Sequence, residues 1–153
     1  MTTTPQQRIE ADLKTAMKAG EKEKLSTLRM LLTEIKNEKI RRIAEVDEAG
    51  FVSLVRKAIK QREEAAAQYK TGGRPELAAK EESEARTLAE YLPAQVDEGQ
   101  IRTAIEEVVA ARGLSGPAAI GPIMKEMLAR FGSSADGGTI NKIAREVLAK
   151  PAG

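Results

Sequence analysis

The amino-acid sequence predicts an all-α protein with two helical parts, an N-terminal part over residues 1–93 and a smaller three-helix part over residues 94–153. Apolar residues recur at steps of three and four, as at Leu25, Leu28 and Leu32, which is the period of an amphipathic helix. No stretch alternates polar and apolar residues over a convincing length, so the sequence lacks the pattern that is typical of strands. Pro and Gly stand where helices would begin and end.

The N-terminal part is expected to open with two helices and the start of a third. The first follows Thr4 and Pro5, an N-cap with proline at the first helical position, and ends at Gly20. The second extends to about residue 42, with Ile35 continuing the apolar face of the leucines. The third follows Asp47, which can cap it, and its apolar stripe weakens after residue 59. A helix that continues beyond its apolar stripe is expected to project from the core.

A long charged hairpin is predicted over residues 54–92, with its turn at residues 71–74. Gly72 and Gly73 can end its first helix, because glycine enters the left-handed conformation without steric penalty. Pro75 can begin the second helix, and small residues on its inner face would let the two helices approach closely. The residues expected on or beside that face are Leu77, Ala78, Glu81, Ala85, Leu88 and Leu92. Pro93 disfavours helical geometry at the residue before it and marks the expected domain boundary.

Three shorter helices are expected beyond that boundary. Asp97 can cap the first, which ends near Gly113; the second begins at residues 116–118 and ends before Gly132; the third follows Asp136. A cluster on the second of these helices is expected to lie in the core, with an exposed groove for another protein's helix as the alternative. Its members are Met124, Met127, Leu128 and Phe131.

Composition excludes several kinds of site. The 153 residues contain no Cys and no His, which removes disulfides, thiol nucleophiles and the commonest general base and metal ligand. We therefore expect no catalytic residues, no metal and no cofactor. No apolar stretch approaches the roughly 20 residues that span a bilayer, so we expect a soluble, cytoplasmic protein without a membrane partner.

Positive charge is concentrated between residues 36 and 62, where eight basic residues accompany four acidic ones, although the formal net charge is only +2. Cations along a helix can follow a phosphate backbone, and the candidates here are Arg56, Lys57, Lys60 and Arg62. Arg56 and Lys60 share a face, whereas Lys57 lies about 100° around the helix from Arg56. An ordinary solvated helix surface remains the alternative interpretation, because basic runs are non-specific signals.

Two further patterns have a functional and a structural interpretation. The glycine-rich residues 132–138 could bind phosphate at a helix N-terminus, but we favour a connection in which Asp136 caps the helix and itself occupies the positive end. Carboxylates on facing helices could hold a metal, but we favour a solvated charged face, because such sites generally use a Glu-x-x-His spacing. These carboxylates are Glu63, Glu64, Glu81, Glu82 and Glu84.

Six motifs in order resemble the YqeY family of GatB/YqeY-like proteins. They are IKQREE at 59–64, GRPELA at 73–78, KEE at 80–82, YLPAQ at 91–95, IGPIM at 120–124 and ADGGTIN at 135–141. The resemblance implies an all-α fold whose C-terminal domain is similar to the tail of the GatB subunit of tRNA-dependent amidotransferase, a domain that helps to hold aminoacyl-tRNA. It also implies the family label of carbon-nitrogen ligase activity with glutamine as amido-N donor.

The chain departs from the family pattern at two places in the C-terminal part. Pro122 stands where members commonly have a lysine, and Ser133 and Ser134 stand where they often have a basic residue. Both changes remove positive charge from the face expected to meet RNA. Lys125 and Lys142, with Arg130 and Arg145, could compensate if they project in the same direction.

These observations lead to two main hypotheses. The first is a non-catalytic module that contacts tRNA or an aminoacyl-tRNA-handling enzyme such as an amidotransferase. The alternative is a protein-interaction adaptor that uses the helical hairpin and binds no nucleic acid. Participation in amide transfer ranks last, because the glutaminase and ATP-binding machinery would have to come from partner subunits.

Overall fold

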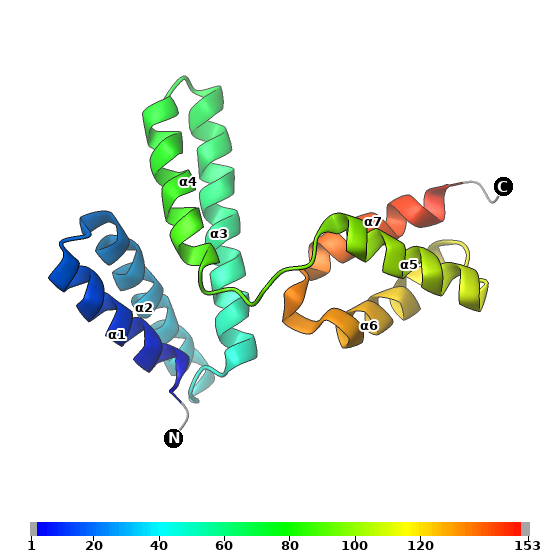
Figure 1. The fold of residues 1–153 in the computed structure, drawn as a ribbon, viewed down its shortest axis with the longest axis horizontal. Helices are drawn as coiled ribbons and strands as arrows, with labels where there is room; N and C mark the ends of the chain where they lie inside the picture. Colours follow the sequence, from blue (N-terminus) through cyan, green and yellow to red (C-terminus); the bar gives the residue numbers. More distant parts are fainter. Residues whose placement is uncertain (1–2, 151–153) are drawn as a thin grey trace. The chain divides into compact units, whose positions relative to one another are not determined.

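The structure, a computed structural model, describes residues 3–150. The chain divides into two compact units, Met1–Leu92 and Pro93–Gly153. The described residues form seven α-helices, two short 3₁₀-helices and no strand, which confirms the predicted all-α class (Figure 1). The helices are α1 (Pro5–Ala19), α2 (Lys22–Arg42), α3 (Glu48–Thr71), α4 (Pro75–Ala89), α5 (Glu98–Arg112), α6 (Ile120–Phe131) and α7 (Gly137–Ala149), with η1 (Pro117–Ala119) and η2 (Gly132–Ser134).

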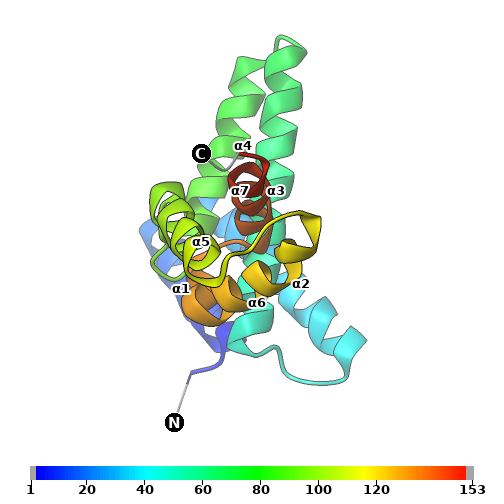
Figure 2. The ribbon, with the colours of Figure 1, turned by 90° about the vertical axis from the view of Figure 1, so that its right-hand side faces the viewer.

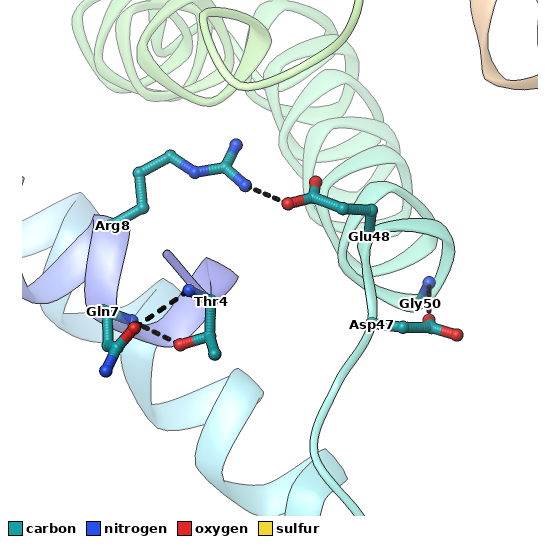
Figure 3. A network of polar contacts seen from close by, with 6 residues as sticks. All are labelled: Thr4, Gln7, Arg8, Asp47, Glu48 and Gly50. Atoms are coloured by element: carbon teal, nitrogen blue, oxygen red, sulfur yellow. Dashed lines mark hydrogen bonds and ion pairs between the residues drawn. The ribbon is translucent and has the colours of Figure 1, made fainter. Parts of the chain in front are cut away.

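The N-termini of α1 and α3 are capped as their sequences predict. Thr4 and Gln7 form a reciprocal capping box in which the Thr4 hydroxyl accepts from the Gln7 amide at 3.1 Å (Figure 3). Asp47 caps α3 by accepting from the Gly50 amide at 2.7 Å. An ion pair between Arg8 and Glu48 joins these two helix starts.

The core of the N-terminal unit lies where the first half of α3 meets α1, α2 and the end of α4. Phe51 is fully buried, and the ring of Tyr91 meets it edge-on with 6.1 Å between centroids. The Tyr91 hydroxyl donates to the Asp12 carboxylate at 2.5 Å, which fixes the end of the unit against α1. The buried apolar residues of this core are Ile9, Ala16, Leu28, Leu31, Ile35, Val46, Phe51, Val55, Ala58 and Leu88.

Helices α3 and α4 form the predicted hairpin and run side by side in both views (Figures 1 and 2). Beyond the main core, buried Ala66 and Ala78 stand near its outer end and Ala85 further down, so the helices approach through small side chains. Gly73 has a φ of +74° in the turn, a conformation that glycine adopts without penalty. The outer part of the hairpin therefore buries little large apolar surface.

Helix α4 ends at Ala89, three residues before the expected end of the hairpin. The Tyr91 and Leu92 amides donate to the carbonyls of Leu88 and Ala89, which makes this segment a series of turns. Pro93 has no amide hydrogen to donate to the Ala89 carbonyl and disfavours helical geometry at Leu92, so the helix does not continue through this segment.

The C-terminal unit packs α5, α6 and α7 around an aliphatic core that includes Ile105, Ile123, Met127 and Ile140. The expected core position of the methionine cluster is confirmed for Met127, whereas Leu128 is 46% exposed and does not belong to the core. Across residues 3–150, no helix combines the length and the apolar character that crossing a bilayer requires.

Candidate nucleic-acid interface

A shallow groove of about 230 Å³ separates the second half of α2 from α3. Arg41 and Lys57 supply its cations, and the amides of Asn37 and Gln61 supply hydrogen-bond donors and acceptors. Its remaining lining residues are Glu34, Glu38 and Leu54. Because Lys57 is exposed, its ammonium group is available to an anionic ligand such as a phosphate.

Glu38 neutralises part of the positive charge of α2. This residue is only 6% exposed, and its carboxylate binds both Arg41 and Arg42, the latter through Nε at 2.5 Å. A buried carboxylate needs such partners, because removal from water disfavours its charged form. The arginines are 73% and 48% exposed, so Arg41 still presents its guanidinium at the groove while it holds Glu38.

Three of the four predicted cations of α3 occupy different environments. Lys57 lines the groove, and Lys60 is exposed on the side of α3 that faces away from the core. Arg56 is half-buried and already interacts with another group. The structure thus brings Lys57 together with Arg41 of α2 and leaves Lys60 as a neighbouring surface cation.

The expected surface position of Arg62 is wrong. This side chain is 7% exposed, and its guanidinium donates through Nη1 to the Ala58 carbonyl at 3.1 Å. Its Nε lies 3.5 Å from Glu84 Oε2 of α4, and Nη2 contacts the sulfur of Met30. Arg62 therefore joins α2, α3 and α4, and it is not available to a phosphate backbone in this conformation.

Lys125 and Lys142 lie in the C-terminal unit on different helices. Lys125 lines a groove of about 540 Å³ with Arg112 of α5 and Pro122 of α6. Lys142 is exposed on α7 and is not among the residues that line this groove. The Arg112 guanidinium donates to Glu126 at 3.1 Å, so a carboxylate offsets part of the charge beside Lys125.

The surroundings of Lys142 are also partly neutralised. Arg102 hydrogen-bonds Glu146, and this bond holds the pKa of that carboxyl below its usual range, with a smaller contribution from the charge of Lys142. Arg145 donates to Asn141 at 2.7 Å, and Arg130 lies 3.9 Å from Glu107. The four arginines of the C-terminal unit are thus engaged in ion pairs and hydrogen bonds.

The favoured interpretation of the glycine-rich loop agrees with the structure. Asp136 caps α7, accepting from the Thr139 amide at 3.2 Å, so a carboxylate occupies the helix N-terminus. Of the hairpin carboxylates, Glu84 pairs with Arg62 and Glu82 pairs with Lys70. Among residues 3–150, no group of three or more acidic side chains lies close enough together to hold a metal ion.

Arg41 belongs to the basic stretch, but its sequence position alone does not assign it to the site. Asn37 and Gln61 carry no sequence signal for a site, because isolated amides acquire one only in the fold. The pairing of α2 with α3 across the groove is a tertiary feature. One available signal was the density of cations near the end of α2, where Lys36, Lys39, Arg41 and Arg42 fall within seven residues.

Comparison with known proteins gives a family and two partial relatives. The family of Yqey-like proteins matches residues 6–148. Over 85 residues the chain is 35% identical to "Altered inheritance of mitochondria protein 41, mitochondrial" of Vanderwaltozyma polyspora, a match covering 55% of this chain and 46% of that protein. Over 85 residues it is 33% identical to an uncharacterised protein of Schizosaccharomyces pombe, covering 56% of this chain and 69% of that protein. The match thus spans about half the length of the Vanderwaltozyma relative.

Proposed function

The chain belongs to the family of Yqey-like proteins, and from this premise we propose that it is a non-catalytic module that contacts tRNA or an aminoacyl-tRNA-handling enzyme. The observation that carries the proposal is the groove between α2 and α3, where Lys57 and Arg41 are brought together from separate helices. Lys60 extends this basic surface along α3. Two helices that present cations and amides along one groove suit a phosphate backbone with sugar or base edges beside it.

The absence of Cys and His from the sequence favours a binding role over catalysis by the chain alone. Release of ammonia from glutamine needs an activated nucleophile, and amide transfer needs ATP-dependent activation of the acceptor. In this proposal a partner enzyme provides both steps. Purified protein mixed with glutamine, ATP and misacylated tRNA is then expected to form no amide product until such subunits are added.

A filter-binding titration with bulk tRNA at low and at physiological salt tests the proposal. We expect retention at low salt that weakens as salt rises, because phosphate contacts release counterions. The double substitution Lys57→Glu and Lys60→Glu should weaken binding at least about tenfold and lower the salt dependence by about one ion for each lost phosphate contact.

The matched control reverses two exposed lysines of the same unit that lie away from the groove, Lys14→Glu and Lys80→Glu. This control makes the same change in net charge, so it measures the long-range effect of charge alone. Equal losses in the two double variants, or no retention of tRNA by the unaltered protein at low salt, would contradict the proposal. Charge reversal at Lys125 and Lys142 measures the contribution of the C-terminal unit separately.

The adaptor function is favoured by one observation: Leu77, expected on or beside the inner face of the hairpin, is instead exposed in the first turn of α4 near the hairpin tip. Substitution of Leu77 by Ser should release a protein partner without unfolding the unit, and RNase treatment should leave that partner bound. Leu88 cannot serve this test, because it is fully buried in the core and a charge there would unfold the unit. A partner that RNase releases would instead support the tRNA proposal.

A further inference from the structure

The C-terminal end of α2 carries two isoleucines that the fold does not bury. Ile40 is 74% exposed, and Ile43, the residue that ends the helix, is 92% exposed. We call these two residues the isoleucine tip. Large apolar side chains that remain in water at neighbouring positions indicate a surface that another partner covers.

The backbone at the isoleucine tip adds a second observation. Ile43 is in the left-handed conformation, with φ 53° and ψ 41°, while glycine occupies the equivalent position after α1 and after α5. A β-branched residue is disfavoured there, because its Cβ meets the neighbouring carbonyl. Ile43 therefore costs stability while it buries almost none of its own surface, which points to a role outside the folding of this unit.

Cations surround the isoleucine tip, and the two carboxylates nearest in sequence are already paired. Lys36 is exposed one turn before Ile40, and Lys39 lies beside it. Glu45 pairs with Lys39 at 2.6 Å, and buried Glu38 is held by two arginines. The tip therefore lies in a stretch where four basic residues accompany two acidic ones, so apolar side chains and a net positive charge occur together.

The positive character continues along the outward side of α2. Lys22, Arg29 and Lys36 are exposed and recur every seven residues, which places them within about 40° of one another and about 10 Å apart along the axis. Ile40 lies within about 40° of Lys36 and extends the same row, and Ile43 follows directly after the helix. The glutamates of α2 lie at least about 140° around the helix from Lys36. These are Glu23, Glu34 and Glu38.

We propose that this outward row of α2 binds an anionic lipid surface, with its cations on the headgroup phosphates and the isoleucine tip at the boundary of the acyl chains. The row is straight over about 30 Å, which suits a flat surface. A phosphate backbone would satisfy the cations but offers little to two aliphatic side chains. A protein pocket would have to be concave around a convex tip, whereas a lipid layer accommodates any projecting apolar group.

The proposal concerns binding at a membrane surface, and it departs from the sequence-based expectation that no membrane is a partner. That expectation rested on the absence of a spanning segment, which surface binding does not require. The row also lies on a different side of α2 from the groove proposed for tRNA. The two proposals can therefore fail independently.

Co-sedimentation of the full chain with vesicles tests the proposal. The probes are vesicles of equal parts phosphatidylcholine and phosphatidylglycerol, with pure phosphatidylcholine vesicles as the neutral reference. We expect binding to the anionic vesicles only. The double substitution Ile40→Ser and Ile43→Asn should reduce the partition coefficient at least about tenfold, and Lys36→Gln should reduce it about fivefold. Both isoleucine positions are exposed, and Asn tolerates the left-handed conformation, so the variant should stay folded.

The matched control is Leu128→Ser, which removes an exposed leucine from the C-terminal unit and should leave the partition coefficient unchanged. The proposal is overturned by no binding to anionic vesicles, by equal binding to neutral vesicles, or by a double isoleucine variant that binds as the unaltered protein does. It is also overturned if that variant loses tRNA retention but not vesicle binding, since the tip would then belong to an RNA surface. Loss of vesicle binding with tRNA retention unchanged supports it.

Discussion

Replacement of Ile43 by glycine is expected to stabilise the N-terminal unit. The left-handed conformation costs a residue with a Cβ about 1–2 kcal/mol, and glycine escapes this penalty. Glycine also makes the unfolded chain more flexible, which offsets about 0.5–1 kcal/mol of the gain. Because Ile43 is 92% exposed, truncation forfeits almost no burial. The net expected gain is about 0.5–1 kcal/mol, or about 2–8 °C in Tm for a unit of this size.

Tyrosine fluorescence offers an assay that reports on this unit alone. The chain has two tyrosines and no tryptophan, and both Tyr69 and Tyr91 belong to the N-terminal unit. Tyr91 is half-buried against Phe51, so its emission should change when the unit unfolds. Thermal and urea unfolding followed by tyrosine emission then give the stability of the N-terminal unit.

Ile40→Gly is the matched control, since it removes the other isoleucine of the tip from a position inside the helix. Glycine is unfavourable there by about 0.5–1 kcal/mol, so this variant should lose stability. The two substitutions should change the stability in opposite directions, because Ile43 is in the left-handed conformation and Ile40 is helical. A decrease in Tm for Ile43→Gly would refute the reasoning, because it would mean that this residue is unstrained or that its side chain stabilises the unit.

Four further substitutions test the interior of the N-terminal unit. Tyr91→Phe removes the hydrogen bond to Asp12 and should cost about 1 kcal/mol near neutral pH. Burial, and after it the Asp12 carboxylate, raises the pKa of Tyr91 above its ordinary value of about 10. The stability that this neutral tyrosine contributes is therefore fully present below pH 10 and should be lost as the pH rises above 10. The Phe variant, followed by far-UV circular dichroism, should lose less stability over that alkaline range, and an unchanged pH profile would count against this account. Glu84→Gln leaves the buried Arg62 guanidinium without its counter-charge and should lower the free energy of unfolding by about 1–3 kcal/mol in urea. Arg62→Met should cost less, because the 19% exposed Glu84 can regain water. A larger loss for Arg62→Met than for Glu84→Gln would contradict the interpretation of a buried ion pair. Leu88→Ala should cost about 2–5 kcal/mol through lost burial and a cavity, and a smaller loss in calorimetry would indicate that the end of α4 is loosely packed.

Local signals predicted the helices because their determinants lie close together in the sequence. Thr4 and Asp47 act as N-caps through residues three positions further on, and Gly20 and Gly113 end their helices through their own backbone conformation. Apolar spacing predicted which face of each helix would be buried. The end of α4 was misplaced, because the turns before Pro93 depend on how the last turn of the helix closes.

The candidate site was less predictable, because it depends on contacts between distant residues. Arg62 resembled the other cations of α3, yet its burial depends on Met30 and Glu84, which lie 32 and 22 positions away. Arg41 and Lys57 line the same groove only because α2 and α3 lie next to each other in the fold. The left-handed conformation of Ile43 could not be predicted from the sequence, because a β-branched residue after a helix does not indicate a positive φ.

The alanine-lined interior of the hairpin has a consequence for how its outer end opens. Opening of the hairpin beyond Ala66 and Ala78 would expose little apolar surface. The free energy of this local opening should therefore be well below the free energy of unfolding of the whole unit. The exposed ion pair between Lys70 and Glu82 adds little to this difference. Amide hydrogens of residues 67–78 should thus exchange with solvent ahead of those around Phe51. The hairpin end could adjust its shape against a partner while the base of the unit remains intact.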